Sequence, residues 1–420
     1  MKCGFPFSNG SPGIEALDMT EKKSKNFLKF VGPGFITAAL VLGPGSLAVA
    51  SKIGANYEFR LLWIIPICVL FMAAFTMVST RIGLSSDLTL IQLIRKKYGN
   101  AVCIVIGVGL FVVAASFQAG NSIGAGMVFG EMFHSSSAPW VVFFSITAIV
   151  LLFFKSFFKI LERIMIAMVG LMLISFAITL IISKPDVSLV LNQFDFTLPK
   201  GSQFLALALV ASSFSVAGAF YQSYLVQEKG WDMGKSKSHE RESLSGIFVL
   251  GIITATVMLV GASVLFPQGI QVNSATEMGK TLEPIFGSYA SLIFMLGLFA
   301  ASFSSLIGNA TLGGVLLSDA LNVGRKLESP NVRYVIMSVI LVGAVVAIIF
   351  GSLPIELIVM AQGLTIIVGP LIGVMLYLIA RDRAKKSQLK LGLPLRIVLI
   401  LGLLLLLVLA GANTYNIFIK

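Results

Sequence analysis

The chain has 420 residues, of which 57% are hydrophobic and 12% are charged, and its formal net charge is +12. Soluble domains have about 25% charged residues, so this composition excludes a soluble protein that covers its own surface with polar side chains. Cysteine occurs only at Cys3, Cys68 and Cys103, and histidine only at His134 and His239. A disulfide framework is therefore excluded, a zinc or haem site is not expected, and no cofactor is predicted.

Long apolar segments dominate the sequence and predict transmembrane helices, because about 20 apolar residues cross the hydrocarbon core of a bilayer. In chain order they are expected near residues 30–52, 60–82, 101–133, 139–156, 160–183, 203–228, 243–266, 286–321, 332–350, 354–380 and 395–418. The fold class predicted is an all-α integral membrane protein with about 11 spans. Residues 1–25 are polar and lysine-rich and contain no apolar signal segment, and residues 1–29 are expected to form a cytoplasmic N-terminal tail.

The distribution of lysine and arginine predicts the orientation, since positively charged loops stay in the cytoplasm. With the N-terminus inside and the C-terminus outside, most of the 31 basic residues fall in inner segments, and the outer segments hold only Lys52, Arg60, Lys184, Lys200, Lys280 and Lys420. The charge therefore follows the topology, and a nucleic-acid partner is not expected. The predicted location is the cell (plasma or inner) membrane, with the lipid bilayer as the partner and the oligomeric state left open.

Two spans carry helix-weakening segments at their centres. The first contains Gly43-Pro44-Gly45-Ser46, and the sixth contains the small, hydroxyl-rich stretch 211–218. Breaks in the first and sixth spans fit an inverted repeat of five helices plus five, with residues 30–183 as the first repeat, 203–380 as the second and 395–418 as an eleventh helix. The alternative is that the small residues only permit tight helix packing.

Several short motifs, in their order and spacing, resemble the Nramp family of divalent-metal transporters from about residue 30 to residue 418. They are Gly32-Pro33-Gly34-Phe35, Arg81-Ile82-Gly83, Gln222-Ser223-Tyr224-Leu225-Val226-Gln227, Phe299-Ala300-Ala301-Ser302-Phe303-Ser304-Ser305, and Ala361-Gln362 with Pro370-Leu371. The resemblance implies a LeuT-type fold that works by alternating access, with substrate between the broken helices 1 and 6. It does not imply an enzyme.

The sequence departs from the family at the metal site that the resemblance implies. The family's metal-binding positions fall on Gly43, Ser46, Ser212 and Ser215, with its histidine position on Ala217, so the aspartate, asparagine and methionine ligands are absent. Divalent cations prefer negative or soft ligands, so no metal ligand is assigned. The 19 acidic residues all fall in loops or near helix ends, and Glu131 and Asp319 are expected to be either solvated or gating groups.

These observations predict a transporter with a neutral site at the midplane. The expected substrate-binding residues are Gly43, Pro44, Gly45, Ser46, Asn121, Ser212, Ser215, Ala217 and Gln362, and Ser304 and Ser305 are a possible sodium site. The main hypothesis is an altered substrate, a small polar or anionic solute, with linkage to Na⁺ left open. The alternatives are divalent cation transport (Mn²⁺, Fe²⁺ or Mg²⁺), as in the family, and a membrane sensor that does not transport.

Overall fold

The computed structural model describes residues 32–418 apart from 193–195, 232, 271–278, 280–286 and 351–354. The predicted tail 1–29 lies outside these residues. The described part of the chain is helical, with the following elements: α2 (Pro33–Val41), α3 (Pro44–Tyr57), α4 (Ile64–Leu84), α5 (Leu90–Tyr98), α6 (Asn100–Met132), α7 (Ser137–Leu152), α8 (Phe157–Ser183), α9 (Val187–Asn192), α10 (Gln203–Ser213), α11 (Val216–Glu228), η2 (Met233–Lys235), α12 (Ser236–Val260), η3 (Gly261–Leu265), η4 (Phe266–Gln268), α14 (Ser288–Ala320), α15 (Pro330–Phe350), α16 (Ile355–Lys385) and α17 (Leu393–Phe418).

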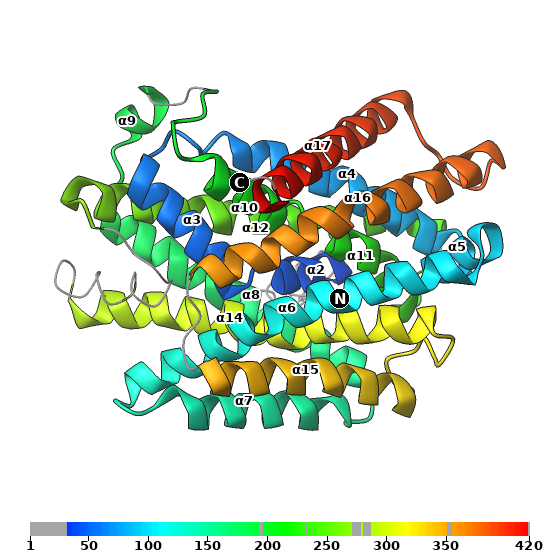
Figure 1. The fold of residues 1–420 in the computed structure, drawn as a ribbon, viewed down its shortest axis with the longest axis horizontal. Helices are drawn as coiled ribbons and strands as arrows, with labels where there is room; N and C mark the ends of the chain where they lie inside the picture. The colour runs from blue at the N-terminus through cyan, green and yellow to red at the C-terminus, as the bar shows by residue number, and fades with distance from the viewer. Residues whose placement is uncertain are drawn as a thin grey trace, which may run out of the picture.

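The predicted all-α membrane fold is confirmed. Within the described ranges, nine helices are long and apolar enough to cross a membrane, and the bent pair α2 and α3 forms a tenth candidate span. The remaining predicted span, 139–156, corresponds to α7, an apolar helix of 16 residues. The helices run side by side, with α9 at one end of the bundle and α5 at the other (Figure 1).

Ion pairs join helix ends at the end of the bundle that contains α5. Arg81 pairs with Glu240 at 2.8 Å, Lys97 pairs with Asp382 at 2.9 Å, and Lys229 pairs with Glu162. These contacts bring together the ends of α4 and α12, α5 and α16, and α11 and α8. We call this end, where α4, α11, α14 and α16 terminate, the basic end.

Helix α12 makes backbone contacts with both halves of the broken first span. A Cβ atom on Gly246 would lie 2.0 Å from the carbonyl oxygen of Gly34 in α2. A Cβ atom on Gly54 of α3 would lie 2.2 Å from the carbonyl oxygen of Met258, and one on Gly261 would lie 2.6 Å from the carbonyl oxygen of Ser51. Only glycine fits such distances, so α12 holds α2 near one end and α3 near the other. The second contact lies where α12 passes into the π-helix η3.

Candidate functional site

The first span breaks at the predicted motif. Helix α2 ends at Val41, Leu42 and Gly43 leave the helical conformation with ψ angles of 71° and 172°, and α3 begins at Pro44. The two halves meet at an angle of 62°. Proline suits the first helical position because its missing N–H needs no partner there. Ser46 completes the turn, since its Oγ accepts the Gly43 N–H at 3.1 Å and lies 2.9 Å from the Val41 carbonyl oxygen.

Side chains of α14 hold the carbonyl groups that α2 leaves free at its C-terminal end. The hydroxyls of Ser304 and Ser305 each donate to the Ala39 carbonyl at 3.0 Å. The Leu40 carbonyl accepts from the Ser305 hydroxyl at 3.2 Å and from Asn309 Nδ2 at 3.1 Å. Ser304 and Ser305 therefore face the break, as a sodium site there requires, but their protons are directed at the carbonyl oxygens that such a cation would use.

The sixth span also breaks, although no glycine or proline marks the position. Helix α10 ends at Ser213, Phe214 and Ser215 have ψ angles of 70° and 94°, and α11 begins at Val216. Ser215 caps α11 by accepting the Gly218 N–H at 3.2 Å. The buried ring of Phe214 packs on Phe71 and Phe75, with centroid distances of 5.6 and 5.1 Å. Tertiary packing of Phe214 therefore fixes where this helix opens.

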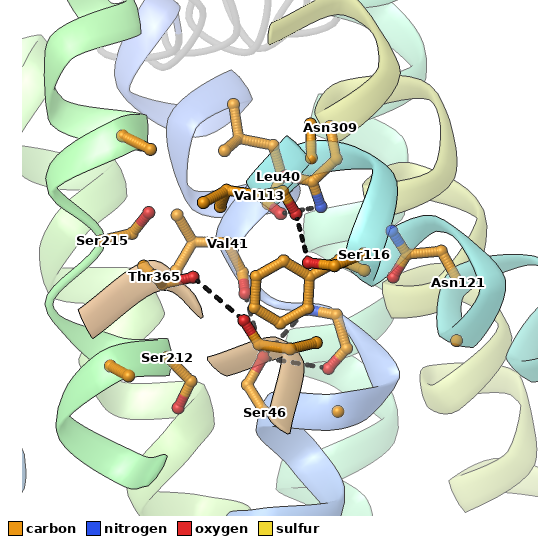
Figure 2. Close-up of a pocket in the computed structure, with 18 of the residues that line it drawn as sticks. Leu40, Val41, Ser46, Val113, Ser116, Asn121, Ser212, Ser215, Asn309 and Thr365 are labelled. Atoms are coloured by element: carbon orange, nitrogen blue, oxygen red, sulfur yellow. Dashed lines mark hydrogen bonds between the residues drawn. The ribbon is translucent and has the colours of Figure 1, made fainter. Parts of the chain in front are cut away.

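A cavity lies between the two breaks (Figure 2). It encloses about 50 Å³ of space for water-sized molecules, enough for an ion with part of its hydration shell. Ser212 and Ser215 lie on the wall formed by α10 and α11, and Asn121 on α6 lies on the opposite side. The lining residues are Leu40, Val41, Gly43, Gly45, Ser46, Val113, Ala114, Ser116, Phe117, Gly120, Asn121, Ala211, Ser212, Ser215, Ala217, Asn309, Leu312, Ala361 and Thr365.

The structure brings together most of the residues predicted for the site. Seven of them line the cavity, namely Gly43, Gly45, Ser46, Asn121, Ser212, Ser215 and Ala217. Pro44 does not line it and instead faces α6, where a Cβ on Gly124 would lie 2.9 Å from Pro44 Cβ. Gln362, Ser304 and Ser305 also lie outside the lining.

The side chain of Gln362 is buried beside the cavity. Its side chain is 0% exposed, and neither Oε1 nor Nε2 has a partner within the part of the chain that the structure describes. The neighbouring residues Ala361 and Thr365 on α16 do line the cavity. Ser213 Oγ, next to the lining residue Ser212, is likewise buried and lacks a partner among the described residues. Unsatisfied buried polar groups are uncommon and call for an explanation, such as a bound ion or water.

Three polar lining residues are not among the substrate-binding residues expected above: Ser116, Asn309 and Thr365. From the sequence, Ser116 is one of several neutral polar residues of the spans, and Asn309 is expected only as a site or interface residue. Thr365 lies three residues after Gln362, so helical spacing could have placed it next to that side chain. No local pattern distinguishes a cavity position from a helix interface for Asn309 or Ser116, because their place depends on how α14 and α6 pack against the first break.

The cavity wall is electrically neutral. None of its lining residues is acidic or basic, and no cluster of three or more His, Cys, Asp or Glu residues able to hold a metal occurs among the described residues. A Cβ atom on Gly43 would lie 3.1 Å from Asn121 Oδ1 and 3.3 Å from Ser305 Oγ. The carboxamide of Asn121 therefore lies directly beside the position where a side chain at residue 43 would begin.

Asp319 does not lie in solvent, which corrects one of the two expectations for it. The residue is 2% exposed, and its Oδ2 accepts hydrogen bonds from Tyr224 and Thr89 at 2.6 and 2.5 Å. Thr89 follows the second span and lies 230 residues before Asp319, so only the tertiary fold brings the two together.

The amino-acid sequence matches a known family along most of its length. The family described as "Natural resistance-associated macrophage protein-like" (Nramp) matches residues 34–416. The divalent metal cation transporter MntH of Caldanaerobacter subterraneus is 23% identical over 80% of this chain and 81% of its own. The MntH of Pectobacterium carotovorum is 25% identical over 84% of this chain and 85% of its own.

Solved structures share the same fold. The manganese transporter of Eremococcus coleocola, crystallised with an aromatic bis-isothiourea compound, matches with a TM-score of 0.71 at 18% identity, over 94% of this chain and 88% of that one. Mhp1, a nucleobase-cation-symport-1 family transporter in a closed conformation, matches with a TM-score of 0.57 at 13% identity, over 91% of this chain and 92% of that one. The fold is thus shared by transporters, and the sequence match over residues 34–416 shows that this multi-pass membrane protein belongs to the Nramp family of secondary transporters.

Proposed function

We propose that this chain transports a divalent metal cation by alternating access through the cavity between the two breaks. The similarity to proteins named divalent metal cation transporters, over about four fifths of the chain, supports this function more strongly than an altered substrate. The cavity supports it as well, because opened helix ends and polar side chains surround a space of ionic size.

The donor set favours a hard cation that keeps part of its water. Neutral oxygens are available from Ser46, Asn121, Ser212 and Ser215, and the carboxamide of Gln362, which has no partner among the described residues, lies beside the cavity. Oxygen ligands suit Mg²⁺ and Mn²⁺, and Mg²⁺ in particular retains several water molecules in proteins. Without a carboxylate or a thioether, the site should bind less tightly and discriminate less among such ions than one that has both.

The topology extends this proposal. Because most of the lysine and arginine residues that the structure describes lie at the ion-paired end, the positive-inside rule supports a cytoplasmic basic end. The N-terminus would then be cytoplasmic, the C-terminus external, and the protein a resident of the cell membrane.

A second candidate function is the transport of a small polar or anionic solute. The observation that favours it is the neutral cavity wall, together with the N-terminal turn of α3, whose residues Gly45 and Ser46 line the cavity. The positive end of a helix dipole favours an anionic group. Coupling to sodium at Ser304 and Ser305 belongs to this candidate.

The deciding experiment combines calorimetry and proteoliposome uptake with Mn²⁺ and Mg²⁺ on the purified protein. Divalent cation transport predicts saturable binding and uptake, both of which Ser215→Leu abolishes by filling the cavity. Ser338→Leu is the matched control, because Ser338 lies on α15, outside the cavity lining. Absence of both signals from folded protein would overturn the proposal, and uptake of an anionic or polar solute would then support the second candidate.

A further inference from the structure

A buried carboxylate joins three helices near the basic end of the bundle. Asp319 lies in the last turn of α14, and its Oδ2 accepts from the Tyr224 hydroxyl of α11 at 2.6 Å and from the hydroxyl of Thr89, the N-cap residue of α5, at 2.5 Å. Arg95 covers the same helix end, with Nη2 2.5 Å from the Asp319 carbonyl oxygen. A buried carboxylate is costly unless hydrogen bonds compensate, so these two hydroxyls stabilise the arrangement.

The cluster lies between two cavities. A large open cavity at the basic end, of about 690 Å³, is lined by Thr89, Tyr224, Gln227, Glu228, Arg325 and Lys326, among others. The midplane cavity is lined by Ala217 of the same helix as Tyr224, and by Leu312 of the same helix as Asp319. In both helices the two residues are seven apart, which corresponds to about 10 Å along one face.

The layer between the cavities is closed by side chains of that face. Tyr221, four residues after Ala217, is 1% exposed and stacks on Tyr224 with ring centroids 6.2 Å apart. About one turn farther along α11, toward the basic end, the Tyr224 hydroxyl donates a hydrogen bond to Asp319. The route from the midplane cavity to the basic end is therefore blocked by two tyrosines of α11 and the carboxylate of α14.

The helix that carries both tyrosines is separate from its preceding half. Helix α11 begins after the break at Phe214 and Ser215, where both residues leave the helical conformation and Ser215 is extended. A helix that starts at such a break can pivot without bending its own hydrogen-bond ladder. Pivoting away from α14 would separate Tyr224 from Asp319 and connect the two cavities.

We propose that Thr89, Tyr224 and Asp319 form the gate that closes the midplane cavity toward the basic end, and that the gate opens when the Tyr224–Asp319 hydrogen bond breaks. This proposal deepens the transport function proposed above, but it does not depend on which solute is carried.

The test measures access to the cavity instead of transport. A single reporter, Ala217→Cys, is placed in a chain whose Cys3, Cys68 and Cys103 are replaced by alanine, and a membrane-impermeant maleimide is applied to inside-out vesicles. The parent should label slowly. Tyr224→Phe and Asp319→Asn should each raise the labelling rate about tenfold, because the first removes the hydrogen bond to Asp319 and the second removes the charge that strengthens it.

Two control variants separate gating from general loosening. Thr89→Ser keeps the hydroxyl and the helix cap, so it should label as the parent does. Tyr289→Phe removes a hydroxyl from an 81% exposed residue of α14 and should also match the parent. An equal rise in the controls would overturn the proposal, as would unchanged labelling of folded Tyr224→Phe. If neither Tyr224→Phe nor Asp319→Asn folds, the cluster is structural and the gate is rejected.

The outcome is independent of the cation assay. Raised labelling in the gate variants, with no Mn²⁺ or Mg²⁺ uptake by the parent, would support the gate and overturn only the proposed cation. Uptake by the parent with unchanged labelling of the gate variants would support the proposed cation and overturn only the gate.

Discussion

The two helix breaks on either side of the cavity are built differently. The first is bent by 62° and contains proline, a serine that completes its turn, and carbonyl groups that accept from three side chains of α14. The second contains neither glycine nor proline between Ala211 and Ala217, and one side-chain cap, Ser215, starts its second half. The first break is thus specified by local sequence and by redundant hydrogen bonds, whereas the second depends on one cap and on the packing of Phe214. The second is expected to change shape more easily.

The largest effect on stability should come from removing the hydroxyls that cap the first break. The double variant Ser304→Ala with Ser305→Ala leaves the Ala39 carbonyl without either of its donors, which should lower the free energy of unfolding by about 1–3 kcal/mol. Each single variant should cost less than half as much, since the other hydroxyl remains. Thermal unfolding in detergent measures this. Ser302→Ala is the control, because the Ser302 hydroxyl donates to the Leu298 carbonyl of its own helix and not to the first break. If the stability losses of the two single variants add up to the loss of the double variant, the two hydroxyls do not substitute for each other at the Ala39 carbonyl.

Restoring a charge at the first break should have the next largest effect. Gly43→Asp places a carboxylate beside Asn121 and Ser305, and should tighten Mn²⁺ binding about tenfold, or about 1.4 kcal/mol. Gly43→Asn, of the same size but neutral, is the matched control and should show little gain. Equal affinities for the two variants in calorimetry would mean that residue 43 does not face the bound ion.

At the second break, removing the single cap should have a moderate effect. Ser215→Ala deprives the Gly218 N–H of its acceptor and should lower stability by about 1 kcal/mol, as is typical of a lost N-cap. Ser215→Thr keeps the acceptor and should restore the melting temperature. Parent-like stability for Ser215→Ala would show that the second break does not depend on its cap.

The smallest effect on stability is expected at Ser213. Its hydroxyl is buried and has no partner among the described residues, so Ser213→Ala should change stability by less than about 0.5 kcal/mol. If the hydroxyl contacts the transported ion, uptake should fall while the melting temperature stays constant. A fall in both quantities would mean that Ser213 contributes to the fold instead.

The sequence was sufficient to predict the features that depend on local chemistry. Span lengths follow from apolar composition, and Gly43 and Pro44 together with Ser46 mark the first break. The exact position of the second break could not be predicted, because Phe214 leaves the helix to pack against Phe71 and Phe75, which lie about 140 residues earlier.

Side-chain placement in the site was predictable only in part. Ser212 and Ser215, expected at the site because of the breaks, line the cavity, but Pro44 turns toward α6, and Gln362 lies beside the cavity without lining it. The sequence predicts Asp319 as either a solvated or a gating group, but its grouping with Thr89 and Tyr224 could not be predicted, for a related reason. Asp319, Thr89 and Tyr224 come from three distant segments, and a carboxylate near a helix end has no sequence signal that distinguishes burial from solvation.

The glycine contacts of α12 limit how the first span can move. The backbone of α12 contacts α2 at Gly34 and α3 at Gly54, and α2 and α3 are joined to each other at the break. Each of the three helices is therefore held by the other two. The 62° angle between α2 and α3 can therefore change only if α12 flexes between its two contacts or releases one of them. The π-helix η3 lies at the second contact, and its irregular hydrogen bonding makes it the segment of this region where such flexing is easiest. Helix α12 contributes no residue to the cavity wall, yet it would limit how far the first span can bend during transport.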